Sequence, residues 1–153
     1  EERLLLAVNE KSPLTAAAMA VCPPQLRQAE FPPFPFKLLA DEPFIVVRAG
    51  QQIHDLYRSL VAQTGASPKI VLESESLNAA LALAGAGLGA TIVTETLARR
   101  SNAALGVKFF AIDPAVPNRL VVAAYRPARY LSKAARLLVR TMQAVAAERF
   151  QNG

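Results

Sequence analysis

Short apolar runs alternate with helical segments along this chain, and that alternation constrains its fold more than any other feature. The runs have the composition of buried strands, and the segments between them carry apolar residues at helical spacing. Strands that alternate with helices predict an α/β fold with a mixed, mainly parallel sheet flanked by helices. The predicted strands are residues 4–8, 44–47, 69–73, 89–94, 107–112 and 120–125, and the predicted helices are 52–64, 77–85, 95–100 and 132–150.

Two segments are predicted in more detail. Between Gln52 and Thr64 the apolar residues fall at i, i+3, i+4, i+7 and i+8, and Gly65 stands where a left-handed C-terminal cap is common. Residues 22–36, in contrast, contain five prolines. That density excludes regular helix and a central strand, so we expect a surface excursion there.

Length and composition restrict the class of protein. The chain has 153 residues, the length of one ordinary domain, and 52% of them are hydrophobic. No apolar run approaches the roughly 18 residues of a membrane span, so we expect no membrane partner. The single cysteine, Cys22, has no His or Cys neighbour and predicts neither a disulfide nor a metal site. Because the chain begins at Glu1 without a signal segment, we interpret it as a fragment of a longer cytoplasmic protein.

Positive charge is concentrated towards the C-terminus. From Arg119 onward seven Lys and Arg residues accompany one acidic residue, Glu148, whereas the preceding part carries ten basic and eleven acidic residues. A basic stripe of this kind is typical of the solvated face of an amphipathic helix, and it also suits a nucleic acid or an acidic partner. The acidic remainder disfavours direct binding of nucleic acid.

The sequence NAALALAGAGLGATIVT, residues 78–94, suggests a glycine-rich phosphate loop, but the order of its elements is reversed. Phosphate loops follow a strand and open a helix, because the amide groups and positive dipole end of the helix attract the anion. Here the predicted helix precedes Gly85 and the strand follows, so the exposed helix end is the carbonyl end, which repels phosphate. We interpret Gly85 and Gly87 as helix terminators and Gly89 as a point of close backbone approach.

The segment FIVVRAGQQIHDL has the order that an anion site requires. Its strand ends at Val47, Arg48, Ala49 and Gly50 form a tight turn, and a helix begins by Gln52. Ligands of open α/β sheets bind outside the carboxyl ends of strands, and a guanidinium at that position suits a carboxylate. The alternative is an ordinary βα loop with a solvated arginine.

A second predicted strand, residues 69–73, ends at ESESL (residues 73–77), and it too is followed directly by a predicted helix. Ser74 or Ser76 is placed to cap the helix that begins near Leu77, and either hydroxyl would lie on the same rim as the predicted anion site.

Catalysis finds little support in the sequence. His54 is the only histidine, and Asp55, its neighbour in sequence, should point elsewhere around the helix. We therefore interpret His54 as a surface or ligand-adjacent residue. Cys22 has no evident base, so we expect neither an enzyme nor a cofactor.

Four stretches together resemble the effector-binding region of LysR-type transcriptional regulators. They are EERLLLAVNEKSPLT, DEPFIVV, VLESESLNAALALAGAGLGATIVTETLAR and RLVVAAYRPARYLSKAARLLVRTM. The resemblance implies a periplasmic-binding-protein-like (type II) fold, in which two α/β lobes hold a small-molecule effector in the cleft between them. It also implies a sensor that controls DNA binding by an intact regulator, whose N-terminal helix-turn-helix lies outside this chain.

On this resemblance residues 1–118 form the second lobe, and residues 119–153 form the returning strand and C-terminal helix of an incomplete first lobe. The last helix carries an apolar stripe that the rest of that lobe would cover. We expect the stripe to dock on a partner chain or on the chain's own sheet, which makes self-association an expected property. Its residues are Leu131, Ala135, Leu138, Met142 and Val145.

The resemblance also assigns effector contacts, and the expected effector is a small, anionic carboxylate. The alternative function is a lobe of a solute-binding protein of a transport system, which shares the fold. The effector contacts are Arg48, Ala49 and Gly50 after the first strand of the site, and Ser76 and Leu77 at the start of the next helix.

Three departures from the family pattern stand out. Residues 12–15 read SPLT where HPLA is common, and Thr94 stands where a proline is frequent. The segment between Leu14 and Asp41 is longer and richer in proline than usual. That segment leads us to expect Phe31, Phe34 and Phe36 near an interface.

Overall fold

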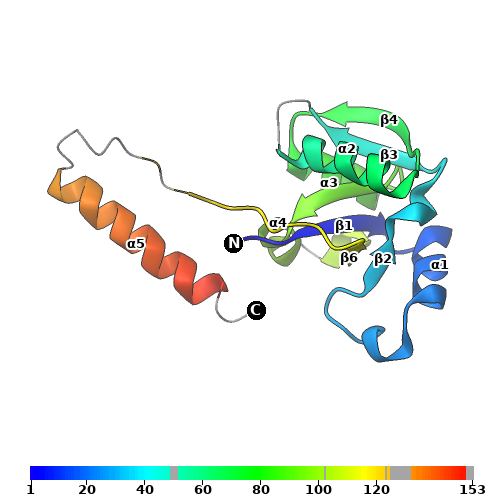
Figure 1. Cartoon of the computed structure of the whole chain (residues 1–153), viewed down its shortest axis with the longest axis horizontal. Coiled ribbons are helices and arrows are strands. Elements are labelled where there is room, and N and C mark those ends of the chain that lie inside the picture. The colour runs from blue at the N-terminus through cyan, green and yellow to red at the C-terminus, as the bar shows by residue number, and fades with distance from the viewer. Residues whose placement is uncertain (49–51, 102, 123, 125–131, 151–153) are drawn as a thin grey trace. The chain divides into compact units, whose positions relative to one another are not determined.

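The computed structural model describes residues 1–48, 52–101, 103–122, 124 and 132–150. Contacts divide the chain into two units. The larger is Arg3–Pro117, and the smaller combines Glu1–Glu2 with Asn118–Gly153. The larger unit contains the sheet and its flanking helices, and the smaller unit contains one long helix (Figure 1).

The predicted elements of the larger unit are all present, and the bounds of the predicted strands differ by one or two residues at one end. A helix at Pro13–Val21 and a strand at Pro33–Pro35 are additional. The strands are β1 (Leu4–Asn9), β2 (Pro33–Pro35), β3 (Pro43–Val47), β4 (Lys69–Ser74), β5 (Thr91–Thr94) and β6 (Val107–Asp113). The helices are α1 (Pro13–Val21), α2 (Gln52–Thr64), α3 (Leu77–Gly85) and α4 (Glu95–Arg100), and short 3-10 turns lie at Pro24–Leu26, Phe36–Leu39 and Ala103–Leu105.

The sheet is mixed, as expected. One set of strands has the order β2-β6-β1-β5, in which β1 runs antiparallel to both β5 and β6, and β2 runs parallel to β6. β3 and β4 form a parallel pair. A parallel bridge between Phe44 and Ala90 connects β3 to the chain just before β5. The strands β3, β4, β5 and β6 therefore end towards the same edge.

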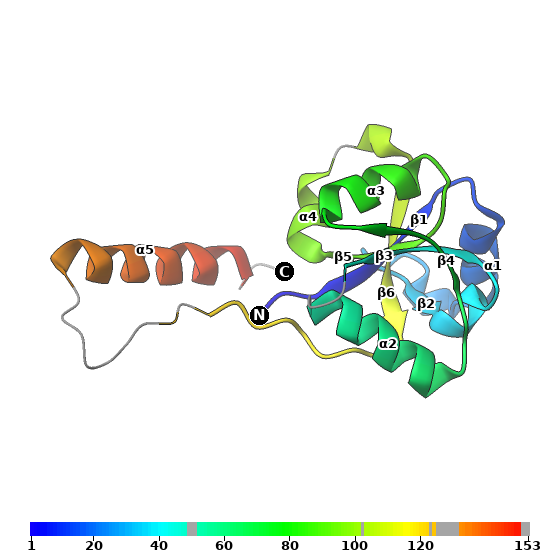
Figure 2. The same ribbon diagram turned by 90° about the horizontal axis from the view of Figure 1, so that it is seen from above.

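Helices cover both faces of the sheet (Figure 2). Leu4, Leu6 and Val8 of β1 pack in the main core with residues of α1 and α2. Leu5 and Ala7, which point to the opposite face, pack with residues of α3 and α4. Burial on both faces explains why β1 is a continuous apolar run rather than an alternating one.

The proline-rich segment is only in part a surface excursion. Its second half forms β2, an edge strand, where proline is tolerated because the outer side of the strand needs no backbone donor. Phe34 and Phe36 are fully buried, and the Phe34 ring meets Phe110 edge-on at 5.3 Å between centroids. The expectation that Phe34 and Phe36 lie near an interface is therefore wrong. Phe31 is half-buried beside two arginines.

The glycine-rich segment ends a helix, as expected. α3 stops at Gly85, whose carbonyl accepts a 2.6 Å hydrogen bond from the Asn9 side-chain amide. Gly87 has a φ of +84°, which favours glycine. At Gly89 an added Cβ would lie 2.8 Å from the Pro43 carbonyl oxygen, because β3 passes close by. A hydrogen-bond donor, the Asn9 amide, therefore meets this helix end.

In the smaller unit Glu2 and Arg119 form an antiparallel bridge with two 2.8 Å backbone hydrogen bonds. The expected strand at 120–125 is not formed by the described residues 120–122 and 124, since the ladder stops at Arg119 and a strand needs a partner. The helix α5 (Lys133–Phe150) follows. Of the expected apolar stripe, Leu131 lies outside the described residues, and Leu138, Met142 and Val145 are exposed.

Candidate functional site

The predicted anion site lies where β3 and β4 end. The two strands are parallel, and Val47 pairs with Ser74 at the last position of the ladder. The pairing extends one residue further, because the backbone N–H of Arg48 donates to the Ser74 carbonyl at 2.9 Å. The carboxyl ends of both strands thus meet at one edge of the sheet, the position at which α/β sheets bind ligands.

Ser76, rather than Ser74, caps α3. Its backbone is extended, and its Oγ accepts a hydrogen bond from the Ala79 N–H at 3.4 Å. Ser74 is buried, and its Oγ donates to the Ser76 carbonyl at 2.9 Å and accepts from the Ser76 N–H at 3.2 Å. Ser74 therefore fixes the backbone that places the cap, and the start of α3 is directed to the same edge as Arg48.

Arg48 is exposed and forms an ion pair through Nη1 with Oε1 of Glu75. Their side chains are 63% and 74% exposed. Sequence reasoning did not single out Glu75. The signal was present, because an acidic residue directly follows β4 and so shares an edge with the residue that follows β3.

The other predicted contacts have different outcomes. Ala49 and Gly50 lie outside the described residues. Leu77 is half-buried and packs against the main core, so its side chain serves the fold. The described part of the site therefore consists of Arg48, Ser76 and the first turn of α3, whose leading amides have no partner within the helix.

His54 does not form a catalytic pair with Asp55. The His54 Nδ1 lies 3.8 Å from the Asp55 Oδ1, beyond hydrogen-bonding distance, and the Asp55 side chain is largely exposed. In the described ranges, no group of three or more His, Cys, Asp or Glu side chains is placed to hold a metal ion. Nor is any helix there both long and apolar enough to cross a membrane.

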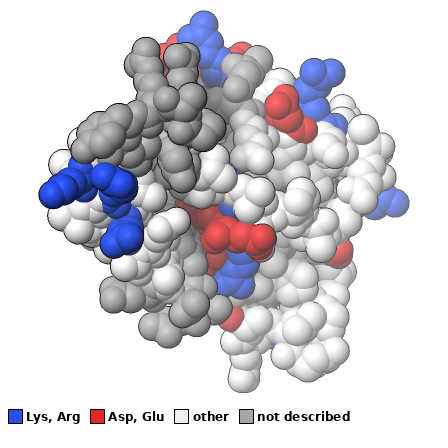
Figure 3. Space-filling model, turned by 60° about the vertical axis from the view of Figure 1, so that its left-hand side comes forward, with Lys and Arg blue, Asp and Glu red and all other residues white. Residues whose placement is uncertain are grey.

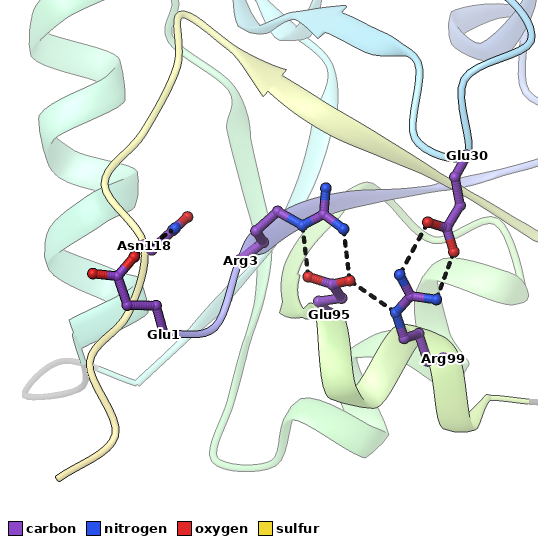
Figure 4. Close-up of polar contacts among 6 residues, drawn as sticks. All are labelled: Glu1, Arg3, Glu30, Glu95, Arg99 and Asn118. Carbon is purple, nitrogen blue, oxygen red and sulfur yellow. Dashed lines mark hydrogen bonds and ion pairs between the residues drawn. The ribbon is translucent and has the colours of Figure 1, made fainter. Parts of the chain in front are cut away.

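A second polar cluster, which the sequence analysis missed, surrounds Glu95 at the start of α4 (Figure 4). Arg3 donates to both carboxylate oxygens of Glu95, at 2.7 Å and 2.8 Å, and Arg99 donates to Glu95 at 2.8 Å. Arg99 also pairs with Glu30 at 2.7 Å. The guanidinium groups of Arg3 and Arg99 lie 5.4 Å and 5.6 Å from the centre of the Phe31 ring.

The charges of this cluster are mutually neutralising. The Arg3 hydrogen bonds hold the pKa of Glu95 below its usual value; Arg99 adds to the effect, and burial opposes it. Glu95 in turn raises the pKa of Arg3. The cluster joins the beginning of β1, the segment before β2 and α4, so we assign it a role in stability. Figure 3 shows one face of the molecule, on which basic side chains (blue) and acidic side chains (red) lie close together.

Two of the cavities that are lined by described residues lie away from Arg48 and Ser76. One, of 420 Å³, lies between residues 27–32 and β6. The other, of 410 Å³, lies beside the start of α1 and includes Gly87 and Gly89. Arg48, Glu75 and Ser76 are exposed.

The comparisons with known proteins concern the family and the fold of this chain. The LysR substrate binding domain family matches residues 5–147. The regulatory domain of CcmR from Synechocystis PCC6803, solved in complex with 2-PG, is 16% identical with a TM-score of 0.68, over 94% of this chain and 62% of that one. The effector binding domain of QuiR in complex with shikimate is 21% identical with a TM-score of 0.66, over 91% and 58%.

A further similar structure is the BenM effector binding domain with its effector benzoate, 18% identical with a TM-score of 0.52, over 71% of this chain and 44% of that one. No curated protein matches the chain significantly. By the coverage of the three structures, the chain spans less than two thirds of the length of these solved domains.

The expected α/β, type II periplasmic-binding-protein-like fold is confirmed by these similarities. The matching family is regulatory and non-enzymatic, which agrees with the expectation of no catalysis. Because the family covers most of its length, this chain belongs to the LysR substrate-binding domain family, the effector-binding domains of LysR-type transcriptional regulators.

Proposed function

We propose that this chain senses a small anionic metabolite, a carboxylate, at the edge where β3 and β4 end, and that binding controls how an intact regulator holds DNA. One observation carries the proposal: Arg48 and the capped start of α3 converge at adjacent carboxyl ends of parallel strands. A guanidinium and helix amides are both donors that suit a carboxylate. The family match favours this function over a lobe of a transport protein.

The division of the chain supports a two-lobed sensor. We assign residues 1–118 to the second lobe and residues 119–153 to part of the first, although the contacts group Glu1–Glu2 and Asn118 with the smaller unit. The two segments at this proposed boundary pair with each other: the backbones of Glu2 and Arg119 exchange hydrogen bonds, and the Asn118 side chain donates to Glu1 at 3.1 Å. An effector would bind in the cleft between complete lobes. Since one lobe offers only part of such a cleft, we expect this chain to bind more weakly than a complete domain.

The chemistry of the effector follows from the site and from relatives. Solved relatives contain shikimate and benzoate, which are both carboxylates. We propose that this chain takes an effector of the same chemical class. DNA would be contacted through a helix-turn-helix outside this chain, in the cytoplasm, and the exposed stripe of α5 would support self-association.

The test is a thermal-shift screen of this chain against small carboxylates, including shikimate and benzoate, followed by calorimetric titration of every compound that raises the melting temperature. We expect Arg48→Ala to weaken binding about tenfold or more, the value of a charged hydrogen bond. Arg58→Ala, which removes an exposed arginine from α2, is the matched control. Unchanged affinity of Arg48→Ala for every binding carboxylate would refute the proposal.

A further inference from the structure

The Arg48 guanidinium already has an anionic partner in the chain without ligand. Glu75 follows β4 as Arg48 follows β3, so the parallel pairing of the strands brings the two side chains together. The carboxylate of Glu75 contacts Nη1 of Arg48. It therefore occupies a donor on the group that the proposed function assigns to the carboxylate of the effector.

Hydrogen bonds fix the backbone at Arg48 and on either side of Glu75, whereas the Glu75 side chain itself is exposed. Arg48 donates through its backbone N–H to Ser74, and Ser74 binds the backbone of Ser76 on the other side of Glu75. Rotation of the Glu75 side chain into solvent breaks none of these hydrogen bonds. The carboxylate can leave the guanidinium without a change in the strand ends or in the cap of α3.

We propose that Glu75 tunes the affinity of this site: its carboxylate competes with the effector for Arg48, and an anion that takes the Nη1 donor must displace it. This inference rests on the proposed function. Competition lowers the affinity for any weak or adventitious carboxylate, so a ligand must make additional contacts to bind well. Because both side chains are exposed, the competition is modest and depends on salt.

The experiment uses sodium acetate as the probe and follows the side-chain Nε–Hε signal of Arg48 by NMR at low ionic strength. Acetate is a bare carboxylate, so its titration reports only access to the guanidinium. In Glu75→Gln we expect acetate to bind Arg48 about two- to fivefold more tightly than in the unaltered chain, the range of an exposed ion pair. The difference should shrink in about 1 M salt, where screening acts within a few ångströms.

Two controls separate competition from a general change in charge. Glu10→Gln makes the same change at the opposite end of the sheet, where the Glu10 N–H bonds to Gly106, and should leave acetate binding unchanged. Arg48→Ala, alone and combined with Glu75→Gln, should abolish the acetate shifts of backbone amides at residues 74–77. Thermal melts confirm that all the variants are folded.

The outcomes distinguish the inference from the function on which it rests. Equal acetate affinity in Glu75→Gln and the unaltered chain, with loss of binding in Arg48→Ala, overturns the inference and leaves the proposed function standing. An equal gain in Glu10→Gln, or a gain that persists without Arg48, also overturns the inference. Acetate shifts that survive Arg48→Ala overturn both, and so does the absence of any Arg48 shift in every variant.

Discussion

Replacing Glu95 by glutamine should expose the contribution of the ion-pair cluster at the start of α4. The Glu95 carboxylate is 11% exposed and receives hydrogen bonds from two arginines, whose side chains are 46% and 43% exposed. Ion pairs that are fully exposed to water contribute between zero and about 1 kcal/mol to the free energy of unfolding, whereas breaking a buried ion pair lowers it by about 3–5 kcal/mol. Since the arginines are nearly half exposed, we take about 1 kcal/mol for each, and expect Glu95→Gln to lower the free energy of unfolding by about 2 kcal/mol.

The assay is urea denaturation of the two proteins at neutral pH, repeated at decreasing pH. Glu30→Gln is the control, because Glu30 is more exposed and, among the described residues, forms an ion pair with Arg99 alone; its loss should cost less than about 0.5 kcal/mol. The pKa of Glu95 is lowered in the folded chain, so its stabilisation is fully present above the pKa of an unfolded glutamate, about 4.3. It is lost as the pH falls through the lower, folded-state pKa.

The stability difference between the unaltered chain and Glu95→Gln should therefore be constant around neutral pH and should shrink below about pH 4.3. A difference under about 0.5 kcal/mol at pH 7 would show that exposure of the arginines cancels the ion pairs. A difference that does not change with acid would show that the carboxylate charge is not its source. Either result would refute the reasoning.

Two further predictions concern the sheet and the exposed helix. Gly89→Ala places a Cβ 2.8 Å from the Pro43 carbonyl oxygen, so chemical denaturation should show the free energy of unfolding lowered by about 2 kcal/mol. Gly65→Ala should cost less, because a Cβ there has open space and only the φ of +68° is unfavourable. Equal costs would contradict close packing at Gly89. Met142→Glu places a charge in the exposed stripe of α5 and should weaken self-association about tenfold in sedimentation equilibrium, whereas Gln143→Glu should not. Equal effects of the two charges would remove the stripe as the interface.

Local sequence predicted those elements whose cause is local. The bounds of α2 were predicted as found, because its apolar spacing is regular and Gly65 follows it with a φ of +68°. The end of α3 was predicted for a similar reason, since Gly87 supplies a left-handed position.

Elements that depend on distant partners were predicted poorly. β2 has three residues, two of them proline, and is a strand only because β6 runs beside it. Residues 120–122 are as apolar as β1 but have no partner strand in the described chain, so the expected strand is not formed. Strand propensity expresses fit to neighbours rather than a property of the segment itself.

The candidate site shows the same contrast between residues that local sequence predicts and residues whose place depends on distant pairing. Arg48 and Ser76 were predicted because the polarity of a strand followed by a helix is local information. Glu75 required knowledge that β3 and β4 are neighbours, and the cluster at Glu95 joins residues up to 92 positions apart. Sequence periodicity carries no information about such pairs.

The most direct test of the central claim is to locate bound carboxylate on the isotope-labelled chain. Backbone amide shifts would be recorded during titration with the tightest-binding carboxylate of the thermal-shift screen. We predict that the largest changes fall on Arg48 and residues 74–79, where β3 and β4 end and α3 begins. Shifts concentrated at the start of α1 or in residues 27–32, or no shifts for any carboxylate tested, would contradict the assignment of this edge as the effector site.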